Sequence, residues 1–151
     1  MNDTMTDEQL LAQPIGYWSW AAATSVRDHI RGHLATVGVT QPQWWVLNQL
    51  GDPDGMHTRH DLTELLQGYL DVGDQLQTDI DDLIARHLVT IDTDGATVMT
   101  PAGERLLAGA VEVQRVAQAQ IHDSVSSDDL LTTMKVLRRM IHNTDGKFWH
   151  H

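Results

Sequence analysis

The segment from residue 58 to residue 100 constrains the fold of this chain more than any other. Thr58 is a helix N-cap residue, and leucines follow it at the spacing of one buried helix face: Leu62, Leu65 and Leu66. A second amphipathic helix is predicted from Asp74 to His87. Two short runs rich in β-branched residues come next, separated by an Asp-Gly turn: 88–91 and 97–99. The predicted order, helix, turn, helix and hairpin, is that of a winged helix-turn-helix.

The flanking sequence predicts four more helices. The first runs from about Ile15 to Val37, and the second begins at a capping box, Thr40 and Gln43, and ends near Gly51. Thr100 caps the first of the last two helices, with Pro101 at its first helical position, and Ser127 caps the final one. The expected fold is therefore a single, mainly α domain over residues 1–151, with the element order α-α-α-α-β-β-α-α.

The predicted helices serve two purposes. Residues 40–100 form the winged helix-turn-helix lobe, whereas 15–37 and 101–142 are long amphipathic helices with more apolar surface than that lobe can cover. Burial against a second copy of the chain is the economical way to remove this surface from water. We therefore expect the first helix and the last two to form the dimerisation lobe of a homodimer.

The middle segment is strongly acidic, although its predicted fold is one that commonly binds DNA. From Asp61 to Asp94 the sequence has nine acidic residues and one basic residue, Arg86, which gives a formal charge of −8. Phosphate neutralisation by Lys and Arg dominates the affinity of proteins for DNA. We therefore expect weak or absent DNA binding at physiological salt, even though the fold favours a DNA-binding function.

Composition limits the functions and the cellular location that this chain can have. The chain has a net charge of −11 and no cysteine, and its polar, acidic start is unlike a signal peptide. The longest apolar runs are a few residues long, far short of a membrane span. There is no Gly-rich phosphate loop or nucleophile motif, and the carboxylates fit a solvated acidic face. These features predict a cytoplasmic protein that has no membrane partner and no cofactor and is not an enzyme.

Three segments of the chain resemble the MarR family of bacterial winged-helix transcription regulators. Residues 38–47 are similar to the start of the family's second helix, and 61–66 to its third helix. Residues 83–89, followed by Met99-Thr100-Pro101-Ala102-Gly103, are similar to the end of its recognition helix and the entry to its fifth helix. The resemblance implies an obligate dimer that represses transcription and releases double-stranded DNA when a small aromatic effector binds.

The resemblance also implies which residues contact DNA. The recognition helix would be Asp74 to His87 and the wing tip Thr93 to Thr97. The DNA-binding candidates come from the third helix, the recognition helix and the wing: Thr58, Arg59, Gln75, Gln77, Thr78, Thr93 and Thr97. The wing lacks the arginine that the family inserts into the minor groove. The alternative is a winged-helix protein that has lost DNA binding and acts as a protein-interaction or small-molecule-binding module.

Tryptophans cluster on the first two long helices. Four tryptophans fit either a core and dimer interface or an aromatic-lined ligand pocket: Trp18, Trp20, Trp44 and Trp45. In such a pocket Arg27 or Arg31 would bind an anionic group. Both uses are compatible.

Histidines are frequent but form no complete metal site in the sequence. His29 and His33 are four residues apart on one predicted helix, a spacing that suits two ligands of one metal ion. Nine histidines in one chain also produce close pairs by chance, and no full ligand set is evident. The sequence alone therefore predicts no metal site.

Overall fold

The computed structural model describes residues 5–55, 57–66 and 75–147, except for the side chain of Gln75. The elements are, in order, α1 Asp7–Leu11, α2 Ile15–Ala35, α3 Gln41–Gly51, α4 Arg59–Leu66, α5 Gln75–Ala85, β1 Val89–Ile91, β2 Thr97–Met99, α6 Pro101–Ile121 and α7 Ser127–Asn143. The mainly helical winged helix-turn-helix predicted from the sequence is confirmed. The short helix α1 was not predicted. Its capping box, Thr6 with Gln9, begins a helix within a segment expected to be merely polar.

The helix ends follow local chemistry that the sequence displays. The Thr40 side chain accepts a hydrogen bond from the Gln43 amide, and the Gln43 side chain accepts one from the Thr40 amide, so the predicted capping box of α3 is confirmed. Thr100 caps α6 with one hydrogen bond, in which its side-chain oxygen accepts from the Gly103 amide. The predicted cap of α7 was wrong by one residue. Ser126, in extended conformation, accepts from the Asp129 amide, and Ser127 is the first helical residue.

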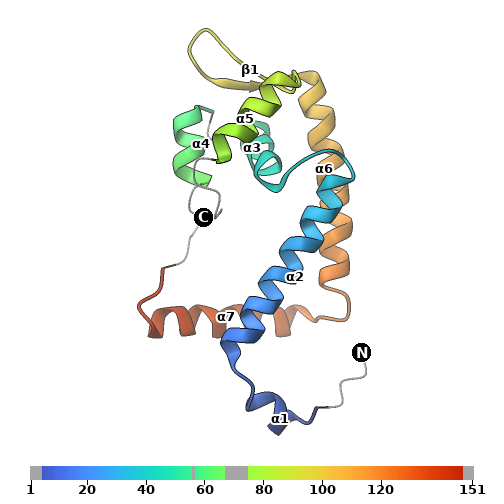
Figure 1. The fold of residues 1–151 in the computed structure, drawn as a ribbon, viewed down its shortest axis with the longest axis vertical. Helices are drawn as coiled ribbons and strands as arrows, with labels where there is room; N and C mark the ends of the chain where they lie inside the picture. Colours follow the sequence, from blue (N-terminus) through green and yellow to red (C-terminus); the bar gives the residue numbers. More distant parts are fainter. Residues whose placement is uncertain (1–4, 56, 67–74, 148–151) are drawn as a thin grey trace.

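One end of the molecule is a compact winged-helix head, formed by α3, α4, α5 and the β1–β2 hairpin (Figure 1). Its core is a cluster of buried aliphatic side chains from all these elements: Val46, Leu47, Leu62, Leu66, Leu76, Ile80, Leu83, Leu88 and Val89. The strands are antiparallel, with Val89 opposite Met99 and Ile91 opposite Thr97. Asp92 Oδ1 closes the turn of the wing by accepting from the amides of Asp94 and Ala96, both at 2.9 Å.

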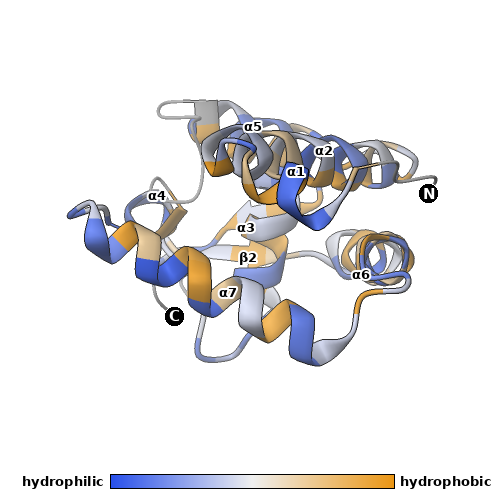
Figure 2. Ribbon diagram, turned by 90° about the horizontal axis from the view of Figure 1, so that it is seen from below, coloured by the Kyte–Doolittle hydropathy of each residue, from blue (hydrophilic) through white to orange (hydrophobic). Residues whose placement is uncertain are grey.

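The helices α2 and α6 form two arms that run side by side away from the head (Figure 1). They pack through a second core cluster near the head, in which Ile30, Leu34 and Ala110 are buried. At the far end α7 extends sideways from the end of α6 (Figure 1), and every residue of α7 is exposed or half-buried. Figure 2 shows hydrophobic residues along α7 as seen from that end.

Large apolar side chains are therefore exposed at the far end, on α1, the start of α2 and α7: Leu10, Leu11, Ile15, Tyr17, Trp18, Trp20, Leu131, Met134, Val136 and Met140. Of the described helices, none has both the length and the apolar character needed to cross a membrane.

Candidate nucleic-acid interface

The helix α5 occupies the position of a recognition helix, and its buried face fixes its orientation. Leu76, Ile80 and Leu83 are at most 1% exposed and anchor α5 in the core of the head. At 100° per residue, this anchoring turns the opposite face toward solvent. That face contains Thr78, Asp81, Asp82 and Ala85, all of which are exposed.

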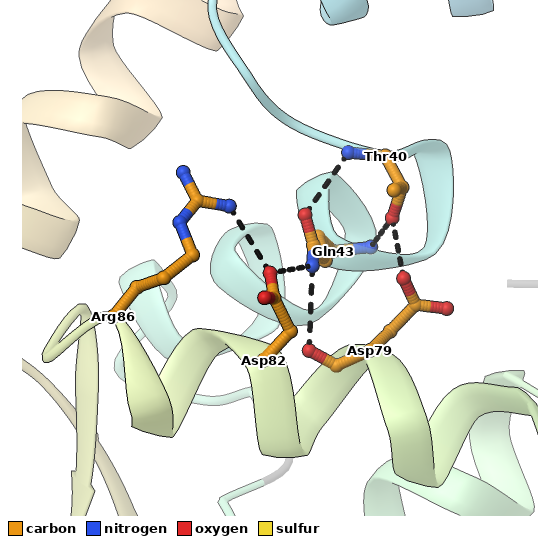
Figure 3. Close-up of polar contacts among 5 residues, drawn as sticks. All are labelled: Thr40, Gln43, Asp79, Asp82 and Arg86. Carbon is orange, nitrogen blue, oxygen red and sulfur yellow. Dashed lines mark hydrogen bonds and ion pairs between the residues drawn. The ribbon is translucent and has the colours of Figure 1, made fainter.

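Two aspartates of α5 hold the N-terminal end of α3 (Figure 3). The Thr40 hydroxyl donates to Asp79 Oδ1 at 2.7 Å, and Gln43 Nε2 donates to Asp82 Oδ2 at 2.7 Å. Gln43 is only 3% exposed, so its amide depends on these partners for its hydrogen bonds. A helix N-terminus also favours nearby negative charge. The acidic residues at positions 79 and 82 therefore join α5 to α3, in addition to giving the surface its charge.

The pKa of Asp79 is raised, chiefly because burial penalises its charged form. The hydrogen bond from Thr40 lowers the pKa, and the nearby charge of Asp82 raises it. Burial therefore disfavours the charged form of Asp79, whereas the hydrogen bond from Thr40 favours it.

Both arginines of the head are bound by aspartates of α5. Between residues 40 and 100 the sequence has two arginines and no lysine. Arg59 Nη2 contacts Asp81 Oδ1, and Arg86 Nη1 donates to Asp82 Oδ2 at 3.2 Å. Each guanidinium is about one third exposed. The cations that would neutralise phosphate are thus already neutralised within the head.

The Arg59 contact belongs to a polar network between α4 and α5. Arg59 Nη1 donates to Gln77 Oε1 at 3.0 Å, and Gln77 Nε2 donates to Thr63 Oγ1 at 2.7 Å. The Thr63 hydroxyl in turn donates to the Arg59 carbonyl at 2.7 Å. Both polar atoms of the Gln77 amide therefore have partners inside the protein, and contact with a base edge requires one of these bonds to break.

The structure places the other predicted DNA-binding residues in different environments. Thr58 is half-buried and caps α4 through the Asp61 amide, whereas Thr78 and Thr93 are exposed on α5 and the wing. The prediction for Thr97 was wrong, because Thr97 is fully buried in β2 and its amide donates to the His57 carbonyl at 2.7 Å. The side chain of Gln75 lies outside the described residues.

The residues proposed from the sequence for a ligand pocket lie in several different environments. Trp18 lines an apolar groove of about 610 Å³ with side chains of α1 and Met140, and Trp20 is 64% exposed. Arg27 pairs with its neighbour Asp28 at 3.2 Å.

Trp44 and Trp45, although adjacent, pack on different clusters. Trp44 lies against the Ile30, Leu34 and Ala110 cluster, and Trp45 lies against the core of the head. Trp44 Nε1 is buried and has no hydrogen-bond partner among the described residues. The same is true of Gln114 Oε1, four residues after Ala110 on α6.

Comparison with known proteins identifies the fold but not a sequence relative. No protein-family model matches the chain, and no curated protein matches it. Among solved structures, MarR from E. coli in its reduced form is 17% identical, with a TM-score of 0.65 over 85% of this chain and 94% of that chain. The transcriptional repressor CouR is 18% identical, with a TM-score of 0.70 over 91% of this chain and 98% of that one.

A third similar structure contains DNA. Rv2887, a MarR family protein of Mycobacterium tuberculosis, in complex with DNA is 20% identical, with a TM-score of 0.63 over 85% of this chain and 98% of that chain. The same protein has also been solved in complex with p-aminosalicylic acid. The chain therefore has the winged-helix fold of the MarR-family regulators.

Proposed function

We propose that the protein is a homodimeric, DNA-binding transcription regulator. The observation that carries this proposal is the separation of two surfaces at opposite ends of the molecule. The helix-turn-helix and the wing lie at one end, and uncovered apolar side chains lie at the other (Figures 1 and 2). A dimer joined at the apolar end would present two recognition helices to two half-sites of a duplex, as dimeric helix-turn-helix proteins do.

The dimer half of the proposal rests on the apolar side chains of α7 and α2. Leu131 and Met134 are 52% and 58% exposed, and Trp18 is 40% exposed. Exposed apolar side chains gathered at one end of the molecule, as here, indicate an interaction site. Light scattering after size exclusion should give a dimer for the wild type and a monomer for the double variant Leu131→Glu, Met134→Glu.

A matched control adds the same two charges to the wing, at the other end of the molecule. Thr90 and Thr93 are both exposed there, and the double variant Thr90→Glu, Thr93→Glu should stay dimeric. A wild type that is monomeric at micromolar concentration, or a control that dissociates as fully as the apolar variant, contradicts the dimer.

The DNA half of the proposal rests on the exposed face of α5 and on the likeness to Rv2887 bound to DNA. Thr78 and Thr93 would contact the duplex directly. Gln77 would reach it after exchanging an internal partner, and Arg59 and Arg86 would lie near it while still paired with Asp81 and Asp82. Fluorescence anisotropy with the upstream region of the protein's own gene, over a series of salt concentrations, tests this half. The slope of log affinity against log salt counts the phosphates that the protein neutralises.

A second candidate function is a winged-helix module that has lost DNA binding. The pairing of both head arginines with aspartates favours it, because no lysine or arginine of the head then remains unpaired for phosphate. Such a module would bind a protein or a small molecule. Absence of any binding to the upstream DNA at low salt, without effector, would favour this candidate.

A small aromatic effector would bind where the arms meet the head. Trp44 supplies an aromatic face there together with a buried, unpartnered N–H group, and Gln114, one helical turn after Ala110 on α6, has a buried oxygen without a partner among the described residues. The binding of p-aminosalicylic acid by Rv2887 supports this class of ligand. Titration with salicylate-type acids should quench the tryptophan fluorescence of the wild type, and less so that of Trp44→Phe. Equal quenching in both proteins places the effector elsewhere.

A further inference from the structure

Two histidines and a glutamine converge on one point between the arms. His29 and His33 lie on successive turns of α2, and their ring centres are 4.7 Å apart. Their Nε2 atoms lie 2.8 Å and 3.0 Å from the same atom, Oε1 of Gln120 on α6. Residues 87 and 91 positions apart in the sequence thus bring three polar atoms together.

This convergence is the arrangement that a chelating pair of imidazoles needs. A ring nitrogen points its hydrogen or its lone pair along one direction in the ring plane, and here both directions meet at one oxygen. A neutral imidazole carries its proton on either nitrogen, so moving that proton to Nδ1 frees both Nε2 lone pairs without changing the charge. A divalent zinc-like ion binds such nitrogens at roughly 2.1 Å, with an amide oxygen or water as further ligands.

The surroundings leave space for those further ligands. A cavity of about 280 Å³ adjoins the site and is lined by Ser25, Val26, His29, Gln120 and Ile121. His29 and His33 are half-buried, which restrains their rotamers, whereas Gln120 at the surface is free to adjust. Among the described residues no three His, Asp or Glu side chains gather, so the third protein ligand would be the Gln120 amide oxygen.

We propose that His29, His33 and Gln120 form a binding site for a zinc-like divalent transition-metal ion. Such an ion would link α2 to α6 at one point along the arms. The proposal is independent of the DNA-binding function, because it concerns the arms and needs no nucleic acid.

The test is zinc competition against a chromophoric zinc indicator, with the full chain as it occurs in solution. All proteins carry His150→Ala and His151→Ala, because the two terminal histidines would otherwise add their own zinc affinity. The site variants are His29→Gln and His33→Gln, which keep a side-chain hydrogen-bond donor facing Gln120 and so preserve the contact between the helices. The matched control replaces two exposed histidines on other helices, His60→Gln and His142→Gln.

We expect one zinc ion per chain in the parent and in the control. The affinity of each site variant should be at least about tenfold lower, equivalent to roughly 1.4 kcal/mol. Zinc should also raise the melting temperature of the parent and not that of the site variants, because an ion that binds the folded state stabilises it. Circular dichroism confirms that all variants stay helical.

Either of two results would overturn the proposal. Equal zinc affinity in the site variants and the control would place the ion elsewhere. No zinc binding by the folded parent would mean that Gln120 only bridges the two helices through hydrogen bonds.

Discussion

The pairing of the head arginines predicts that removal of two carboxylates raises the nonspecific affinity for DNA. In the double variant Asp81→Asn, Asp82→Asn the guanidinium groups of Arg59 and Arg86 lose their ion-pair partners and become available to phosphate. The net charge of each protomer rises by two because two negative charges are removed, both from the exposed face of α5. Nonspecific affinity for duplex DNA at low salt should rise at least roughly tenfold, about 1.4 kcal/mol.

The slope of log affinity against log salt should change as well. Each phosphate neutralised adds about 0.9 to the slope of log affinity against log salt. Two free arginines in each of two protomers would therefore change the slope by up to roughly −3.6. The cost to folding should be small, because both ion pairs are partly exposed and such pairs contribute about 0–1 kcal/mol each. The new amide at position 82 can still accept the Gln43 hydrogen bond.

The control removes the same number of arginine-paired carboxylates from the arms. Asp28→Asn and Glu112→Gln free Arg27 and Arg115, and the net charge changes equally. Fluorescence anisotropy with a random duplex compares the two double variants. An equal rise in both would show that net charge alone is responsible. No rise in the α5 variant would refute the reasoning, because that face would then not approach DNA.

Two further predictions concern how the head is held together. Asp79→Asn keeps an oxygen for the Thr40 hydroxyl and removes a carboxylate whose pKa is raised above its ordinary 3.8, so in the wild type the charged form costs stability as the pH rises through the folded pKa. Urea unfolding should show the variant at least as stable as the wild type at pH 7, and this advantage should disappear below the unfolded pKa. A loss of stability at pH 7 would mean that the charge itself stabilises the start of α3. Gly103→Ala should destabilise the fold by roughly 3 kcal/mol or more, because a Cβ there would lie 2.1 Å from the Leu88 carbonyl oxygen. In the same unfolding assay Gly109→Ala on the same helix, with Val37 at 4.0 Å, should stabilise by about 0.5–1 kcal/mol, and equal behaviour of the two variants would contradict the packing argument.

The sequence predicted the elements whose signals are local. Capping residues such as Thr40 and Thr100 bond to amides three residues ahead, so the starts of α3 and α6 were predicted correctly. The cap of α7 was displaced by one residue because consecutive serines, Ser126 and Ser127, both satisfy the capping pattern. In strands as short as β2, the sequence gives even less information about which side chains are buried than it gives about helix starts. In β2 the polar Thr97 is buried and Val98 is 44% exposed, the reverse of what hydrophobicity suggests.

The parts of the candidate sites that depend on tertiary contacts could not be predicted. The sequence shows an acidic helix, but it does not show that Asp79 and Asp82 face the N-terminal end of α3, 39 residues away in each hydrogen-bonded pair. It also could not show that Gln120 lies between His29 and His33. The spacing of the histidines was visible, whereas their shared partner depends on how α6 packs against α2.

The salt dependence of wild-type binding to the upstream region of its own gene tests the central claim most directly. In our proposal the winged-helix head binds DNA while Arg59 and Arg86 stay paired with aspartates of α5. Anisotropy should show binding at low salt that favours the upstream fragment over a scrambled duplex, with a slope well short of the roughly −3.6 that four free arginines would give. No binding at low salt, or a slope at or beyond that value, would contradict the account.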